Sequence, residues 1–134
     1  MSGWMPHAMS NRATSLRKLL CRMNELPEFA EQELTDVNQV GNFGNRPLHV
    51  AAGWNDPNAV KLLVESGADV NGVGEEWMTP LHRAAAAGSL EAAAALLRLG
   101  ARLDCTDSGG ATPLKLARSL DRRQIVTLFD EWSC

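Results

Sequence analysis

Short apolar patterns of helical spacing recur along this chain at one fixed distance. Segments beginning at Pro47, Pro80 and Pro113 read PLHVAA, PLHRAA and PLKLAR, and the two intervals between their prolines are equal. We call this interval the repeat distance. Proline suits the first turn of a helix, and the threonine that precedes the second and third proline is a favourable N-cap. Each segment is therefore predicted to begin a helix.

A second apolar stripe follows in the first two units, after a break at residues 55–57 and at Gly88. The second helices are predicted at about 58–66 and 90–99. Their buried stripes are expected to be Val60, Leu63, Val64, Ala93, Leu96 and Leu97. Gly67 and Gly100 then stand where a helix ends in a left-handed residue. Each unit reads as helix, helix and projecting loop, and neighbouring units must stack because one unit cannot bury its own apolar face.

The two ends of the repeated region depart from this pattern. Upstream, helical spacing over residues 16–23 predicts one helix, and residues 27–34 predict a second short helix. Downstream, Lys115 and Arg118 replace the histidine and the second alanine of the earlier units. We expect the upstream pair to act as an N-terminal cap and the third unit to act as a C-terminal cap.

These segments and their spacing resemble the ankyrin repeat, in which Thr-Pro-Leu-His-x-Ala recurs with a period of about 33 residues. The resemblance extends over residues 36–132. It implies an all-α solenoid of stacked helix pairs with projecting hairpin loops, made of about three recognisable repeats and an atypical N-terminal helical cap. We expect a disordered tail at 1–13 and a single domain at 14–134, divided into a cap (14–42), two repeats (43–75 and 76–108) and a C-terminal capping repeat (109–134).

Charge is distributed unevenly along the chain. Residues 1–24 carry four bases and no acid, residues 25–76 carry ten acids against Arg46 and Lys61, and residues 77–134 carry seven bases and six acids. The acidic middle would repel phosphate backbones, so nucleic acid is not an expected partner. No apolar stretch reaches the roughly 18 residues of a membrane helix, and no signal-peptide core is present. We therefore expect no membrane partner and a cytoplasmic location.

The sequence offers little catalytic chemistry. Cys21, Cys105 and Cys134 are odd in number and lack a CxxC pair, which disfavours both a disulfide framework and a zinc site. His49 and His82 recur at the repeat distance, which favours a structural role. No nucleophile motif or phosphate-binding glycine loop is found. We expect no enzymatic activity, no metal and no cofactor. The alternative from another functional class is an enzyme that uses His49 or His82.

The resemblance implies that a partner protein contacts the hairpin tips and the exposed side of each first helix. The candidate contact residues at those positions are Phe43, Asn45, Trp54, Glu75, Glu76, Trp77, Met78 and Arg83. Phe43, Trp54 and Trp77 place three large rings at positions expected to be exposed, and Trp77 stands where the family usually has glycine. Burying such a ring against a partner is a common source of binding energy.

Alternatives remain open at three of these positions. Trp54 and Trp77 either contact a partner or pack within the chain, and Arg83 either reaches into the concave groove or pairs with an acid. Glu75 and Glu76 favour a partner with a basic surface. A short repeat stack with no further domain favours a monomer that binds and occludes one partner, as a stoichiometric inhibitor or immunity-type protein. A scaffold or assembly adaptor is the alternative.

Overall fold

The computed structural model describes residues 7–133, and within them the chain forms helices and loops but no strands. The described residues form seven α-helices: α1 (His7–Asn24), α2 (Pro47–Gly53), α3 (Pro57–Glu65), α4 (Pro80–Ala87), α5 (Leu90–Arg98), α6 (Pro113–Ser119) and α7 (Arg123–Ser133). Two single 3-10 turns complete the described elements, η2 (Pro27–Phe29) and η3 (Glu75–Trp77). The expected all-α class is confirmed.

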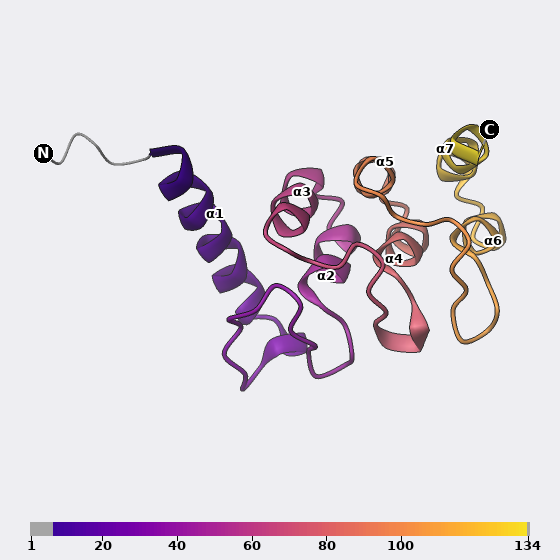
Figure 1. Ribbon diagram of the computed structural model, residues 1–134. Coiled ribbons are helices and arrows are strands. Elements are labelled where there is room, and N and C mark those ends of the chain that lie inside the picture. Colours follow the sequence, from indigo (N-terminus) through magenta and orange to yellow (C-terminus); the bar gives the residue numbers. More distant parts are fainter. Residues whose placement is uncertain (1–6, 134) are drawn as a thin grey trace, which may run out of the picture.

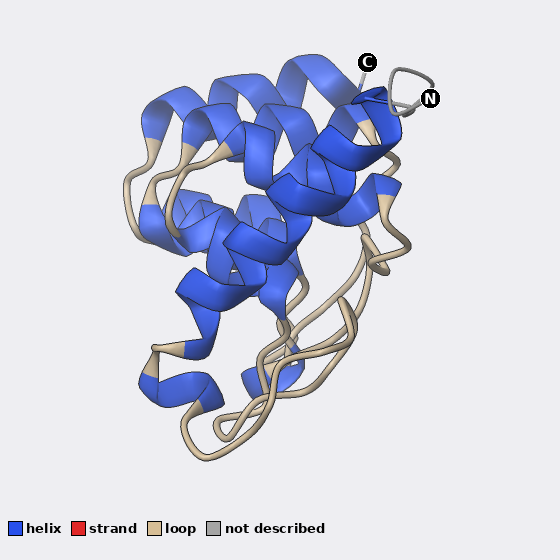
Figure 2. Ribbon diagram, turned by 90° about the vertical axis from the view of Figure 1, so that its left-hand side faces the viewer, coloured by secondary structure: helices blue, strands red, loops and turns tan. Residues whose placement is uncertain are grey.

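The helices pair and stack as the repeat distance predicts. Figure 1 shows α2, α4 and α6 in one row and α3, α5 and α7 in a second row above it. Each helix contacts the other helix of its own unit and the equivalent helix of the next unit. The loops that precede α2, α4 and α6 all project from the same side of the stack (Figure 2). The fold is a helical solenoid with projecting loops.

Local sequence explains where these helices begin and end. Pro47, Pro80 and Pro113 each occupy the first turn of a first helix. The Thr79 hydroxyl accepts a hydrogen bond from the backbone nitrogen of His82, which caps α4. At the other end of α4, Gly88 has a φ of 75°, the left-handed conformation that terminates a helix at little cost for glycine.

Small and branched side chains fill the space between the units. Ala51, Ala52, Ala84 and Ala85 are fully buried along the first helices, which allows adjacent units to approach closely. Leucine and valine from the second helices complete the core, and Leu63, Leu96 and Val60 are also fully buried. Removing a buried leucine from such a core costs about 2–5 kcal/mol. The stacking of units is thus the main source of stability.

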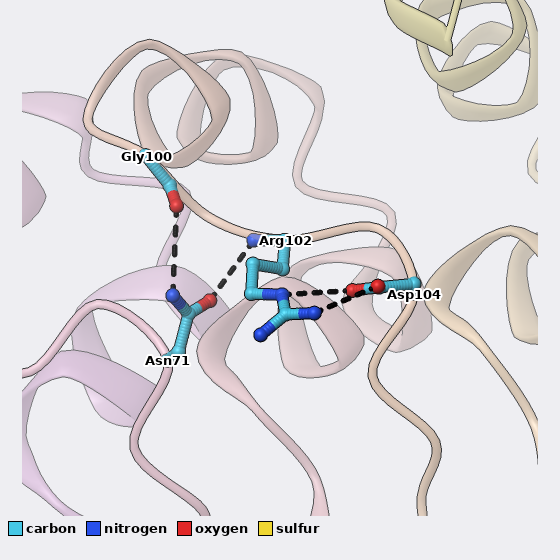
Figure 3. Close-up of polar contacts among 4 residues, drawn as sticks. All are labelled: Asn71, Gly100, Arg102 and Asp104. Atoms are coloured by element: carbon cyan, nitrogen blue, oxygen red, sulfur yellow. Dashed lines mark hydrogen bonds and ion pairs between the residues drawn. The ribbon is translucent and has the colours of Figure 1, made fainter.

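Asparagine side chains join successive units where each second helix ends. Asn71 Oδ1 accepts from the backbone nitrogen of Arg102 at 2.9 Å, and its amide nitrogen lies 3.5 Å from the carbonyl oxygen of Gly100 (Figure 3). Asn38 makes the equivalent contacts one unit earlier, with Asp69 and Gly67. Arg102 in turn forms an exposed ion pair with Asp104 at 2.8 Å. These contacts hold the loops in register with one another.

The N-terminal part differs from the expectation in two ways. Helix α1 begins at His7, so residues 7–13 of the expected tail are helical, while residues 1–6 lie outside the described part of the chain. Ala8, Met9 and Ala13 are good helix formers, and no glycine or proline interrupts them. The helix expected over 27–34 is only the η2 turn, because Glu31 adopts a φ of 65° and ends it.

Helix α1 nevertheless covers the first repeat, as a cap should. It leans across the N-terminal end of the stack in Figure 1 and contacts both α2 and α3. Its side chains Leu19 and Met23 are buried, and they join Phe29 of η2 in the core. At the opposite end, Ile125 and Phe129 of α7 are buried against the preceding unit.

Candidate protein-binding surface

The three hairpin loops, residues 36–46, 69–79 and 102–112, have equivalent tips. The tips are closed by hydrogen bonds from Gly41 N to Asn45 O at 2.7 Å, from Gly74 N to Met78 O at 2.8 Å, and from Asp107 N to Ala111 O at 2.9 Å. The loops also contact one another, since the Ser108 nitrogen donates to the Glu76 carbonyl at 2.9 Å. Side chains at corresponding tip positions therefore lie next to each other.

Large apolar side chains are exposed on the first two loops. Trp77 is 63% exposed and Phe43 is 56% exposed, and Val40 and Val73 are also exposed. Val40 and Val73 are one repeat distance apart and hold the same place in successive loops, whereas the third loop has Thr106 there. Sequence reasoning missed both valines, although their recurrence at the repeat distance was a signal that could have identified them.

Two carboxylates directly precede the exposed tryptophan. Glu75 and Glu76 are both exposed, and the backbone nitrogen of Glu75 is held at 3.2 Å by the side-chain oxygen of Asn45. We call the exposed side chains of Val40, Phe43, Val73, Glu75, Glu76 and Trp77 the tip surface. It combines an apolar ridge with negative charge.

Asn45 does not belong to this surface, contrary to the expectation from its position. Its side chain is 3% exposed and donates to the Glu28 carboxylate at 3.0 Å. The same carboxylate accepts from the backbone nitrogen of Phe43 at 2.6 Å. Glu28 and Asn45 therefore fix the first loop to the N-terminal cap and to the second loop, and Asn45 has a structural role rather than a partner-binding one.

Trp54 lies at the C-terminal end of α2, away from the loop tips. It is 36% exposed, and the guanidinium carbon of Arg22 in α1 lies 4.7 Å from its ring centroid. A cation over a tryptophan face is attractive by about 0.5–1 kcal/mol at an exposed site. The ring thus has a partner within the chain, which supports the packing alternative at this position.

Met78 and Arg83 are half-buried, and each lies beside a neighbouring unit. The Met78 carbonyl oxygen is 2.8 Å from His49 Nε2. The Arg83 side chain approaches Gly53, where an added Cβ would lie 3.8 Å from Arg83 Cγ. One alternative for Arg83 was an ion pair with an acidic residue. Within residues 7–133 Arg83 forms no such ion pair.

Both repeat histidines are buried and bonded on both ring nitrogens. His49 Nδ1 accepts from the Arg46 backbone nitrogen at 3.2 Å, so Nε2 carries the proton and donates to Met78. His82 makes the same contacts with Thr79 and Ala111. Burial, reinforced by the positive charges of Arg83 and Arg46, lowers the pKa of His49 to about 4. The ring is neutral at physiological pH and has no nitrogen free for catalysis.

Cavities and potential ligand groups lie away from these residues. A cavity of about 700 Å³ sits beside α1 and is lined by both apolar and polar side chains, among them Leu16, Leu34 and Glu33, but neither histidine lines it. In the part of the chain that the structure describes, no three His, Cys, Asp or Glu side chains are grouped to hold a metal ion. None of the described helices is both long and apolar enough to cross a bilayer.

The helix pairs stack, the loops project from one side, and buried histidines join the first helices α2 and α4 to the next loop. These features define a repeat protein of the helical solenoid class. A family model for ankyrin repeats, described as occurring in many copies, matches residues 48–97, which extend from α2 to the end of α5. This segment of the chain is therefore made of ankyrin repeats. A search of curated proteins finds no match. Ankyrin repeats are protein–protein interaction modules and are typically not enzymes.

Proposed function

We propose that this protein binds one partner protein through the tip surface and, by covering it, acts as a stoichiometric inhibitor or immunity-type protein in the cytoplasm. The observation that carries the proposal is the placement of Phe43 and Trp77, both more than half exposed, on adjacent loops. Side chains of this size seldom stay exposed together on a monomer without a binding role. Glu75 and Glu76 beside them favour a partner with a basic surface.

The proposed surface extends beyond the tips along the first helices. Arg83 approaches Gly53 of the preceding unit, and the proposal takes these two residues and the exposed part of Trp54 as the helical edge of the surface. Met78 lies between Trp77 and Arg83 in the sequence and is half-buried. The mechanism is occlusion, in which a rigid stack covers a functional patch of the partner without chemical change. The protein itself is a monomer before it binds.

The test is affinity capture with the full chain, followed by calorimetry with the purified partner. The variants are Phe43→Ala and Trp77→Ala, and the matched control is Trp132→Ala, because Trp132 is 46% exposed on α7 at the far end of the stack. Loss of an anchoring aromatic residue typically weakens binding by about 2 kcal/mol or more. We expect both tip variants to lose affinity and the control to retain it.

The same complex separates inhibition from scaffolding. An inhibitor forms a one-to-one complex in which the partner's activity is lost in proportion to the amount bound. A scaffold or assembly adaptor instead brings a third component into the complex while the partner stays active. Equal affinity of wild type, both tip variants and the control would contradict the proposed surface.

A further inference from the structure

One backbone position in the three hairpin loops is occupied differently in the second loop. Residues 44, 77 and 110 follow one another at the repeat distance, and all three have positive φ angles: 93° for Gly44, 61° for Trp77 and 82° for Gly110. Glycine adopts this left-handed region freely, whereas a residue with a Cβ atom is strained there by about 1–2 kcal/mol. The second loop therefore places its largest side chain at a glycine position.

The structure of the loop does not require this tryptophan. The nitrogens of Gly44, Trp77 and Gly110 donate to the equivalent carbonyls at 3.0, 3.1 and 3.0 Å, so glycine closes the same hydrogen bond in two of the loops. The second loop differs at the preceding residue, where Glu76 also has a positive φ of 56°. The ring itself is 63% exposed and gains little from burial within the chain. Backbone strain and an exposed apolar ring are two costs with no matching benefit in the isolated protein. Such residues persist where they serve a functional contact.

The neighbouring charges decide what kind of group contacts the ring. Glu75 and Glu76 directly precede Trp77 and are exposed with it. Inserting the ring into a dry apolar pocket would remove water from these carboxylates without replacing their hydrogen bonds, which is costly. A guanidinium group avoids this cost, because it stacks on an indole face and donates to carboxylates at the same time.

We propose that the Trp77 ring is the docking site for an arginine side chain in a basic segment of the partner, with the Glu75 and Glu76 carboxylates accepting hydrogen bonds from the guanidinium group. This inference rests on the proposed function and names the chemistry of the partner at the tip surface. The indole is 63% exposed, so it remains accessible to an incoming side chain.

The first test measures thermal unfolding of Trp77→Gly and Trp77→Ala. Glycine relieves the strain and alanine keeps a Cβ atom at the strained position, while both remove the ring. We expect Trp77→Gly to raise the Tm by about 2–4 °C and Trp77→Ala not to raise it. An unchanged or lower Tm in Trp77→Gly would show that the ring stabilises the free protein, which overturns the inference.

The second test uses a defined probe, a short synthetic peptide that alternates arginine and glycine, followed by NMR of the tryptophan indole N–H signals. A peptide with citrulline in place of arginine keeps the shape and removes the charge. We expect the arginine peptide to shift the Trp77 signal, and the citrulline peptide and the Glu75→Gln, Glu76→Gln double variant to bind about two- to fivefold more weakly. Equal binding of both peptides overturns the inference.

A further comparison separates this inference from the proposed function. The partner recovered by affinity capture is titrated with wild type, Trp77→Gly and Trp132→Ala. Loss of affinity in Trp77→Gly with no discrimination between arginine and citrulline peptides would support the tip surface and overturn the arginine contact. Retention of full affinity by Trp77→Gly and by Phe43→Ala would overturn both.

Discussion

His49 Nε2 donates to the carbonyl oxygen of Met78 at 2.8 Å and so connects the first helix of one repeat to the hairpin loop of the next. His82 and Ala111 repeat this contact one unit further along, also at 2.8 Å. The buried imidazole of His49 therefore fixes the loop that carries Trp77. Its position on the tip surface depends on the repeat before it.

Acidification should weaken the fold through His49. The pKa is about 4 in the folded protein and near 6.5 in the unfolded chain, so the unfolded state takes up a proton first as the pH falls. This contribution is complete above pH 6.5 and is lost as the pH falls toward about 4. The difference between the two pKa values corresponds to about 3 kcal/mol. Urea unfolding at several pH values measures it.

A His49→Gln variant provides the comparison for that pH dependence. Glutamine does not titrate in this range, so the free energy of unfolding of the variant should change less between pH 6.5 and 4, whatever its starting stability. The two proteins have the same carboxylates, so the difference between their pH profiles isolates the contribution of residue 49. The same pH dependence in both proteins would contradict the assignment to His49.

Asn71→Ala should loosen the stack between the first and second repeats. The substitution removes the acceptor for the Arg102 nitrogen, at 2.9 Å, and the contact with Gly100. The expected loss is about 1–2 kcal/mol in the free energy of unfolding. Asn58→Ala, an exposed change in the first turn of α3, is the control and should be close to neutral. Equal losses in the two variants would argue against a role for the asparagine contacts.

Two glycine substitutions should differ in size because their causes differ. An alanine Cβ at position 41 would lie 2.6 Å from the carbonyl oxygen of Glu28, so the backbone must move. At position 110 nothing lies within 4 Å of the added atom, and only the φ of 82° opposes it. We expect losses of about 2 kcal/mol or more for Gly41→Ala and about 1 kcal/mol for Gly110→Ala, measured by urea unfolding. The reverse order would contradict this account of the loops.

Trp54→Ala and Trp77→Ala should separate packing from binding. Trp54 packs under Arg22 and is about two-thirds covered, so its removal should lower the free energy of unfolding by about 1–2 kcal/mol. Trp77→Ala removes an exposed ring and should leave stability nearly unchanged. Circular dichroism during urea unfolding measures both. Larger destabilisation by Trp77→Ala than by Trp54→Ala would contradict the assignment of Trp54 to packing and of Trp77 to binding.

The sequence predicted the repeated core well because the signals there are local and recur. Pro47, Pro80 and Pro113 mark the starts of α2, α4 and α6, and the expected second helices differ from α3 and α5 by one residue at most at either end. The sequence also predicted the buried faces of these helices, since their alanines and leucines recur at the repeat distance. The resemblance also placed Trp77 at a position expected to be exposed, and its side chain is exposed.

The errors arose where contacts between distant residues decide the outcome. Burial of Asn45 depends on Glu28, 17 residues earlier, and the cover over Trp54 comes from Arg22 in a helix outside the repeats. Residues 27–34 carry helical spacing but are held in an irregular path, in which Asn24 Oδ1 accepts from the Leu34 nitrogen at 3.0 Å. A repeat pattern in the sequence does not predict such contacts between distant residues.

The most direct test of the proposed surface is the affinity of the captured partner for Trp77→Gly compared with wild type, measured by calorimetry alongside the Tm of each protein. The account predicts that the variant is the more stable protein and binds its partner at least about tenfold more weakly. A variant that is equally or less stable and binds as tightly as wild type would contradict the claim that Trp77 is kept at a strained position for binding.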